Sequence, residues 1–187
     1  LVHAKGAQEF VVTETDVNEQ AIGAAFGSGK FLIGWQVVAG TTPETTQPVA
    51  AQFVTAAGAL SGSSIAFNAV SPSGWCGESC PHIGSDGTIF LLVAGCGGSG
   101  GNNYKTQAVV ISPSGSFLSA ALDLNAGHAV NGGMEHGNVS FDGTNYLVVW
   151  SSGVSQRDVF GRLVSTGGAP AGSAFAIATA LGHEREP

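Results

Sequence analysis

The strongest constraint on the fold is an internal repeat, because three different landmarks recur in the same order along the chain. The first landmark is an aromatic residue that opens an apolar run, at Phe31, Phe90 and Tyr146. The second is the glycine of a later turn, at Gly58, Gly115 and Gly168. The third is an apolar residue seven positions after that glycine, at Ile65, Leu122 and Phe175. Landmarks that stay in phase indicate three copies of one structural unit.

Residues 138–180 show what one unit contains. Four short apolar runs, at 138–141, 146–150, 159–164 and 175–177, are separated by turn sequences. The first turn is Asp142-Gly143, and Asp-Gly favours a tight hairpin because both residues tolerate positive φ. The second run has few polar interruptions and predicts a strand buried on both faces, whereas the third alternates and predicts a half-exposed strand. Each unit is therefore expected to be a four-stranded antiparallel sheet.

We expect one repeat domain over residues 1–187. Residues 1–20 hold the last strand of a preceding blade (9–12) and a linker, and 181–187 resemble the linker to a further blade. The three blades between them, the second and third with their preceding linkers, span 21–70, 71–126 and 127–180. The sequence thus predicts an all-β, β-propeller-like fold of three four-stranded antiparallel blades plus one extra N-terminal strand. A single β-sandwich or an open stack of sheets is the alternative.

Three blades are too few to close a propeller, which typically has about 4–8. An open end would leave an apolar sheet face in water. The chain is therefore expected to be either part of a longer propeller or an obligate oligomer.

Composition excludes several classes of partner. Charged residues make up only 10% of the chain and the net charge is −7, with 6 Lys and Arg in total. Binding to nucleic acid or to an anionic membrane needs clustered basic residues, so neither is expected. No apolar stretch is long enough for a transmembrane helix, and the 29 glycines suit a chain with many turns.

Two motifs carry a resemblance to a known group of proteins. FDGTNYLVVW at 141–150 and DVFGRLVSTGGAPAGSAFAI at 158–177 resemble repeats in large secreted proteins of bacteria, often predatory or soil species. The first two units depart from the pattern, since GSG replaces Asp-Gly in one and Ala94 replaces the tryptophan in the other. The resemblance implies a propeller-like fold and an extracellular location, and it implies no defined activity.

Three cysteines, Cys76, Cys80 and Cys96, lie close together in the sequence. A regular hairpin about Asp86-Gly87 would pair residue 79 with residue 96, which brings Cys80 near Cys96 with Cys76 in reach. In a secreted chain a disulfide is the simplest product, either one that involves Cys96 or a local Cys76–Cys80 bond. Free thiols and a metal site with His82 remain alternatives, and neither a metal nor a cofactor is predicted.

The candidate ligand-binding residues are few. Trp75 stands in a linker, and His128 and His136 share a glycine-rich loop that could form a binding surface. Trp35 and Trp150, at equivalent strand ends, are expected to pack between blades. The run GCGGSG at 95–100 matches a nucleotide-binding pattern, but a predicted strand rather than a helix follows it, so we interpret it as a loop.

No catalytic constellation is evident. The carboxylates are sparse, Asp86 and Asp142 are explained by turns, and no nucleophile-elbow motif occurs. We therefore predict a secreted, non-catalytic scaffold or interaction module that binds itself or the remainder of a longer propeller. A carbohydrate-binding, lectin-like propeller is the first alternative, and a glycan-active hydrolase is the second.

Overall fold

The computed structural model describes residues 11–12, 18–38, 49–67, 76–96, 105–125, 137–152 and 158–179; for 18–22, 38, 76–80 and 96 it describes the backbone. This part of the chain is all-β, without helices, and forms three four-stranded antiparallel sheets. Sheet 1 contains β1 (Asn18–Gly27), β2 (Lys30–Val38), β3 (Val49–Thr55) and β4 (Leu60–Ala66). Sheet 2 contains β5 (Cys76–Ser85), β6 (Phe90–Cys96), β7 (Lys105–Ile111) and β8 (Leu122–Asp123). Sheet 3 contains β9 (Gly137–Phe141), β10 (Asn145–Ser152), β11 (Asp158–Ser165) and β12 (Phe175–Ala178).

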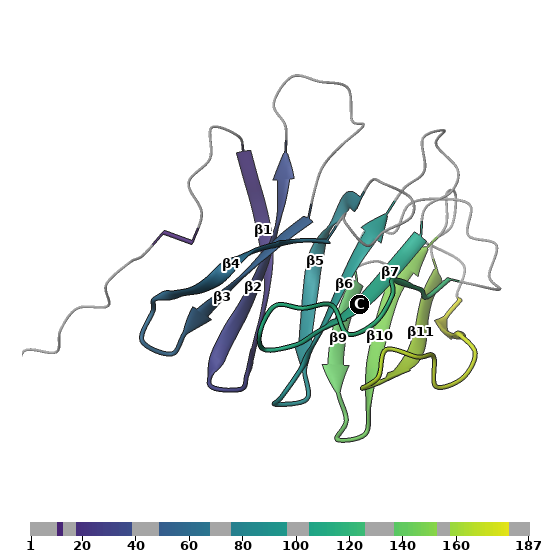
Figure 1. Ribbon diagram of the computed structural model, residues 1–187. Coiled ribbons are helices and arrows are strands. Elements are labelled where there is room, and N and C mark those ends of the chain that lie inside the picture. The colour runs from purple at the N-terminus through teal and green to yellow at the C-terminus, as the bar shows by residue number, and fades with distance from the viewer. Residues whose placement is uncertain are drawn as a thin grey trace, which may run out of the picture.

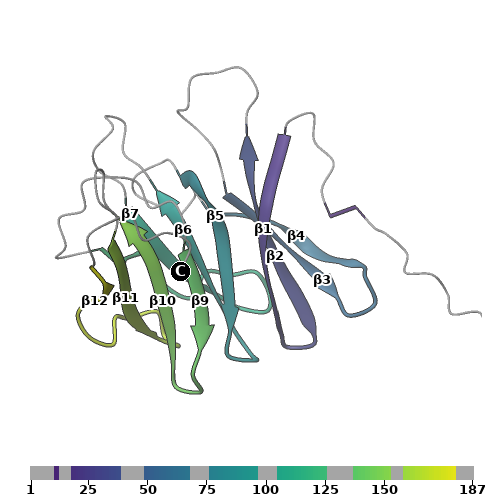
Figure 2. The same cartoon turned by 180° about the vertical axis from the view of Figure 1, so that it is seen from behind.

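Within each sheet the strands follow chain order, so that every strand is hydrogen-bonded to its sequence neighbour. The three sheets lie face to face in the same order, and sheet 2 lies between the other two (Figures 1 and 2). The predicted all-β class and the division into three four-stranded units are confirmed. A closed ring is not part of the described structure, in which sheets 1 and 3 each have one outer face.

The repeat is reproduced in atomic detail at the turn after the third strand of each sheet. The glycine N–H donates to the carbonyl three residues earlier at the same distance of 2.9 Å in Gly58, Gly115 and Gly168. All three glycines have φ between 79° and 89°, a left-handed conformation that suits glycine. The landmark glycines therefore recur because the same turn needs the same backbone conformation in every unit.

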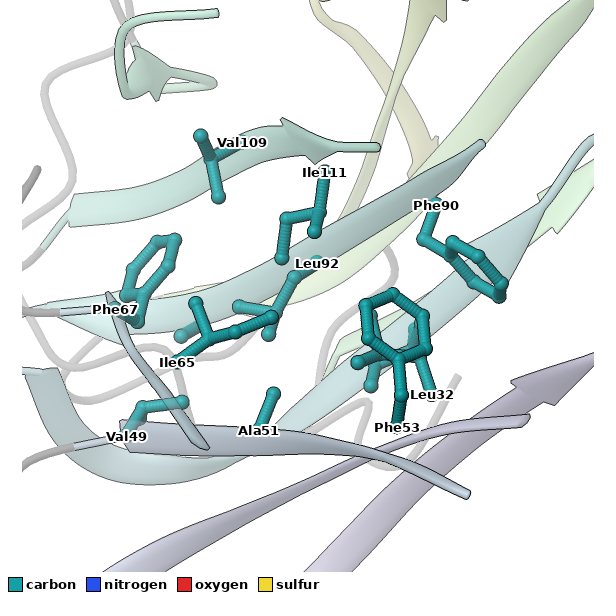
Figure 3. Packing of buried hydrophobic residues seen from close by; sticks show 12 residues of the cluster. Leu32, Val49, Ala51, Phe53, Ile65, Phe67, Phe90, Leu92, Val109 and Ile111 are labelled. Carbon is teal, nitrogen blue, oxygen red and sulfur yellow. The ribbon is translucent and has the colours of Figure 1, made fainter. Parts of the chain in front are cut away.

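Sheets 1 and 2 bury a common apolar layer, here called the first intersheet cluster. Its buried members are Leu32, Val49, Ala51, Phe53, Ile65, Phe67, Ile83, Phe90, Leu92, Ala94, Val109 and Ile111. Figure 3 shows Phe53 of sheet 1 close to Phe90 of sheet 2, and their ring centroids are 5.3 Å apart in an edge-on arrangement. Apolar burial of this kind is the main force that holds the two sheets together.

Sheets 2 and 3 bury a second intersheet cluster. Its buried members are Leu91, Val93, Ala108, Val110, Leu124, Tyr146, Val148, Trp150 and Val164. Because β6 contributes Phe90 and Leu92 to the first cluster and Leu91 and Val93 to the second, it is buried on both faces, as predicted. In β10 burial alternates over residues 145–150, so the same prediction is wrong for the second strand of sheet 3. β7 is also buried on both faces, and so is β3 over residues 51–54, so the expectation of a half-exposed third strand is wrong for sheets 1 and 2 and is met only by β11 of sheet 3.

The described structure includes only part of the two predicted end segments, the N-terminal strand 9–12 and the C-terminal linker 181–187. Of the expected N-terminal strand 9–12, Val11 and Val12 belong to no strand, and the other two residues lie outside the described ranges. Residues 181–187 also lie outside them. The first strands of sheets 1 and 2, from Asn18 and Cys76, are ten residues each, longer than the short run expected at 138–141 of the third unit.

Candidate interaction surfaces and polar sites

The three residues predicted to bind a ligand, Trp75, His128 and His136, all lie outside the described residues. Their assignment stays a prediction. Trp150 packs between sheets 2 and 3, as expected, and its ring stacks on Phe160 at 6.3 Å between centroids. Trp35 is also buried, but it belongs to neither intersheet cluster, so the same expectation is not met there.

The strand register changes the expectation for the cysteines. The hairpin is regular from Ser85↔Phe90 to His82↔Val93, but it contains two register shifts further from the turn. As a result Ser79 pairs with Gly95, and Cys76 is directly opposite Cys96. The predicted pairing of residue 79 with residue 96 is therefore wrong, and Cys76 rather than Cys80 is the residue aligned with Cys96.

The turn carboxylates have structural roles. Asp86 Oδ1 accepts hydrogen bonds from Thr88 N (2.7 Å), Thr88 Oγ1 (2.7 Å) and Ile89 N (2.8 Å). Burial alone would raise the pKa of Asp86, but these hydrogen bonds outweigh burial and hold the pKa below its usual value. Asp142 accepts the corresponding bonds from Thr144 N and Asn145 N, which lower its pKa as well. Both carboxylates are thus kept ionised to hold a hairpin turn.

Tyr146 joins the hairpin turn of sheet 2 to sheet 3. Its hydroxyl accepts a hydrogen bond from Asp86 N at 3.1 Å and lies 3.4 Å from the Ile89 carbonyl oxygen, to which it donates. Burial raises the pKa of the Tyr146 phenol, and the neighbouring negative charge of Asp86 raises it further. A phenol that stays protonated serves here as a polar contact between sheets. No group of three His, Cys, Asp or Glu side chains suited to a metal ion occurs among the described residues.

We call the face of a sheet that is turned toward the next sheet its forward face, and the opposite face its backward face. The backward face of sheet 1 is an outer surface of the described structure. Phe26 and Phe31 lie there with ring centroids 4.9 Å apart, and Val54 pairs with Phe31 across β2 and β3. Leu60 pairs with Val54 in turn. Phe26 is 53% exposed, Phe31 is 40% exposed and Leu60 is 52% exposed, so this face carries apolar side chains in contact with water.

The forward face of sheet 3 is the second outer surface. A Cβ on Gly161 would lie 3.0 Å from both Phe175 and Ile177, which places these two side chains over Gly161 on the same face. Gly161 pairs with Val149, and Leu147 lies two residues before Val149 on the same strand face. Phe175 is 43% exposed and Ile177 is 51% exposed. Both ends of the described stack therefore present apolar side chains to solvent.

Sequence reasoning anticipated exposed apolar faces at open ends but did not name the residues that form them. The repeat itself identifies two of these residues, because Phe26 and Phe31 hold the same positions relative to the hairpin as Phe141 and Tyr146.

A group of buried polar atoms marks one end of sheet 3. Trp150 Nε1, Ser151 Oγ, Ser152 Oγ and Asp158 Oδ1 are buried, and within the described structure they have no hydrogen-bond partner. Trp150, Ser152 and Asp158 lie on one face of sheet 3, whereas Ser151 lies on the other. Ser152 is directly opposite Asp158 in the strand register, so we name Trp150, Ser152 and Asp158 the strand-end polar cluster. Buried polar atoms are nearly always satisfied in native proteins, so this cluster is a candidate site for a small polar ligand. The Trp35 indole nitrogen, at the equivalent place in sheet 1, is likewise buried and without a partner there.

The geometry defines a class of protein, an all-β repeat protein of face-to-face four-stranded sheets. Comparison of the chain with protein-family models, with curated proteins and with solved structures gives no significant match. Among the described residues, no helix is long and apolar enough to cross a membrane.

Proposed function

We propose that the protein is a non-catalytic scaffold or interaction module of the β-propeller type, and that its outer sheet faces are its binding surfaces. The observation that carries the proposal is the exposure of large apolar side chains on both outer faces. Contiguous exposed apolar surface marks a protein interaction site in a soluble protein.

Two further observations support this function. The two intersheet clusters are made from the same kind of apolar face that stays exposed at the ends of the stack. Asp86 and Asp142 are engaged in hairpin turns, where their carboxylates accept backbone hydrogen bonds, and so they serve the fold. An extracellular location for the protein rests on the resemblance of residues 141–150 and 158–177 to repeats of secreted bacterial proteins.

Native mass spectrometry and sedimentation velocity over a range of protein concentrations test the proposal. We expect the wild-type chain to form assemblies larger than one copy. The double variant Phe31→Glu/Phe175→Glu places a charge on each outer face and is expected to shift the population toward single chains. Leu118→Glu is the matched control, because Leu118 is 55% exposed but lies in the segment between β7 and β8 of the middle sheet. A compact, stable single chain at every concentration would contradict the proposal.

The strand-end polar cluster favours a second candidate function, a carbohydrate-binding, lectin-like propeller. Its indole N–H, its serine hydroxyl and its carboxylate are groups of the kind that bind sugar hydroxyls through hydrogen bonds. A glycan array compares the wild type with Asp158→Asn, Ser152→Ala and Trp75→Ala. Loss of a wild-type signal in these variants supports carbohydrate binding, and an array without any wild-type signal rejects it.

A further inference from the structure

The two outer faces are opposite faces of the same structural unit, which makes them different from each other. Each internal contact in the stack joins the forward face of one sheet to the backward face of the next. The backward face of sheet 1 is free at Phe26, Phe31 and Leu60, and the forward face of sheet 3 is free at Phe175 and Ile177. Trp35, Gln52 and Val54, also on the backward face of sheet 1, are buried. One end of the stack is therefore a backward face and the other end is a forward face, and these are the two kinds of face that form the internal contacts.

The free backward face of sheet 1 resembles a face that is buried elsewhere in the molecule. Its aromatic pair, Phe26–Phe31, has ring centroids 4.9 Å apart. The equivalent pair in sheet 3, Phe141–Tyr146, has centroids 5.0 Å apart and packs in the second intersheet cluster against sheet 2. Tyr146 is fully buried there, whereas Phe31 is 40% exposed. The same arrangement of rings is thus covered by a neighbouring forward face in one sheet and uncovered in the other.

The free forward face of sheet 3 resembles the forward face of sheet 1, which is buried against sheet 2. Phe175 holds the position of Ile65 in sheet 1, and Ile177 holds the position of Phe67. Ile65 and Phe67 are buried in the first intersheet cluster against the backward face of sheet 2. The side chains that contact the next sheet in sheet 1 are therefore the ones that remain exposed in sheet 3.

The exposed apolar part of each outer face carries no charged residue within the described ranges. Glu19, opposite Val37 in the register, belongs to the backward face of sheet 1 at the end of β2 away from Phe31. On the forward face of sheet 3, the positions Leu147, Val149, Leu163, Phe175 and Ile177 are all apolar. Among the described side chains on the backward face of sheet 1, Gln52 is a buried amide, and its Nε2 donates to the carbonyl oxygens of Phe53, Ser61 and Gly62. Contact between the exposed apolar parts of the two faces avoids the large cost of burying an uncompensated charge.

We propose that the forward face of sheet 3 in one copy of this chain binds the backward face of sheet 1 in a second copy, in the manner of the internal intersheet contacts. This inference rests on the proposed interaction function and specifies its partner and geometry. Phe31 of one copy then packs on Leu163 of the other, as Phe90 packs on Phe53 inside the chain. Such a contact is heterologous, and two copies bring together six sheets, a number within the range of about 4–8 blades at which propellers close.

Two single variants, each blocking one face, separate this arrangement from the alternatives. Phe31→Arg blocks the backward face of sheet 1, and Phe175→Arg blocks the forward face of sheet 3. Leu60→Arg and Ile177→Arg repeat the test at a second exposed position of each face, and Leu118→Arg is the control. Circular dichroism confirms that each variant is folded, and one variant is prepared with ¹⁵N so that native mass spectrometry distinguishes the two chains.

A heterologous contact needs one intact face of each kind. We therefore expect each variant alone to associate about tenfold more weakly than the wild type or worse, which corresponds to about 1.4 kcal/mol. A mixture of the Phe31→Arg and Phe175→Arg chains is expected to form a mixed dimer, because each supplies the face that the other lacks. If Phe175→Arg self-associates like the wild type while Phe31→Arg does not, or the reverse, like faces pair and the inference is overturned while the interaction function stands. If the wild type never associates, both are overturned.

Discussion

At the scale of single residues, the side chains with the most distinct roles are those that hold turns and join sheets. Asp86 fixes its hairpin by accepting three hydrogen bonds, and the same turn receives the Tyr146 hydroxyl from sheet 3. Ser28, in the equivalent hairpin of sheet 1, donates from its backbone N–H to the Gly87 carbonyl at 2.8 Å. The hairpin turns of sheets 1 and 2 therefore also contribute to the contact with a neighbouring sheet.

The lowered pKa of Asp86 predicts a loss of stability in acid. Because the folded pKa lies below the usual value of 3.8, the contribution of the carboxylate is complete above that value and is lost as the pH falls through the folded pKa. We expect Asp86→Asn to weaken this dependence, since the amide oxygen still accepts hydrogen bonds but does not titrate. Urea unfolding at about pH 6 and about pH 3 measures how much of the free energy of unfolding is lost in acid. Equal losses of unfolding free energy in wild type and variant between the two pH values would refute this role.

At the scale of strands, the approach of neighbouring sheets depends on a residue without a side chain. Gly23 of β1 faces β5, and a Cβ at this position would lie 2.5 Å from the Pro81 carbonyl oxygen and 3.0 Å from His82 Cα. Both atoms belong to the backbone of a paired strand and cannot rotate away. Gly23 is therefore needed for the distance between the first strands of sheets 1 and 2.

Substitution of Gly23 tests this close approach. Gly23→Ala is expected to lower the free energy of unfolding by about 1–3 kcal/mol, the usual cost of overpacking. Gly167→Ala is the control, because its nearest neighbour, Ser165 Oγ, would be 3.8 Å from the new Cβ and no strain is expected. Denaturant unfolding measures both. A Gly23→Ala protein as stable as the control would mean that the strands separate without cost.

The register of β5 and β6 predicts which cysteines form a disulfide. Residues directly opposite in an antiparallel pair have Cα atoms about 4.5–5.5 Å apart, which lies within the range of about 4.4–6.8 Å for disulfides. We therefore expect Cys76 and Cys96 to be joined when the two thiols lose two protons and two electrons to an added oxidant such as oxidised glutathione.

Peptide mapping without reduction decides between the possible pairs. Cleavage after Glu78 and after Phe90 separates the three cysteines into different peptides. Cys80→Ser should keep the cross-link and Cys96→Ser should remove it. A cross-link that joins Cys80 to either of the other cysteines would show that the register is not the deciding factor.

The strands also show how far the sequence determines the fold. The predicted runs 146–150, 159–164 and 175–177 lie within β10, β11 and β12, because landmark residues and turn glycines constrain them directly. The shifts in the β5–β6 ladder could not be placed in this way. One of the two shifts lies between Ser79 and His82 and so includes Pro81, which has no N–H to donate, and a ladder can accommodate such a gap by a bulge at several positions.

The sequence of one unit does not predict which residues form the outer faces and the polar cluster, and the reason is physical. Whether Phe31 or Phe175 is buried depends on the number of neighbouring sheets, which is a property of the assembly and not of one unit. The polar cluster at Ser152 and Asp158 depends on the burial of strand ends, which alternation along a strand does not reveal.

At the scale of the whole molecule, equivalent residues in the three sheets have different environments. Leu32, Leu91 and Leu147 each follow the landmark aromatic residue and lie on the forward face of their sheet. Leu32 and Leu91 are fully buried under the next sheet, while Leu147 is only partly buried because no sheet covers it in the described structure. In a one-dimensional stack, each unit gains stability from its neighbours, so the same residue should contribute differently in each position.

This difference gives a prediction that depends on protein concentration. Leu32→Ala and Leu91→Ala are each expected to cost about 2–5 kcal/mol at any concentration, because each leaves a cavity in an internal layer. Leu147→Ala should cost less than about 1 kcal/mol in dilute solution, where its face is wet. Its cost should rise with concentration if a second copy covers that face, since association stabilises the folded state by mass action.

Thermal unfolding at several protein concentrations measures this dependence, and Leu118→Ala, at an exposed position of the middle sheet, provides the baseline. A Leu147→Ala cost that stays small even where the wild type is fully assembled would place the contact between copies elsewhere. A cost that approaches that of Leu91→Ala would mean that the third sheet has acquired, from a second chain, the same cover that the first two sheets receive from within.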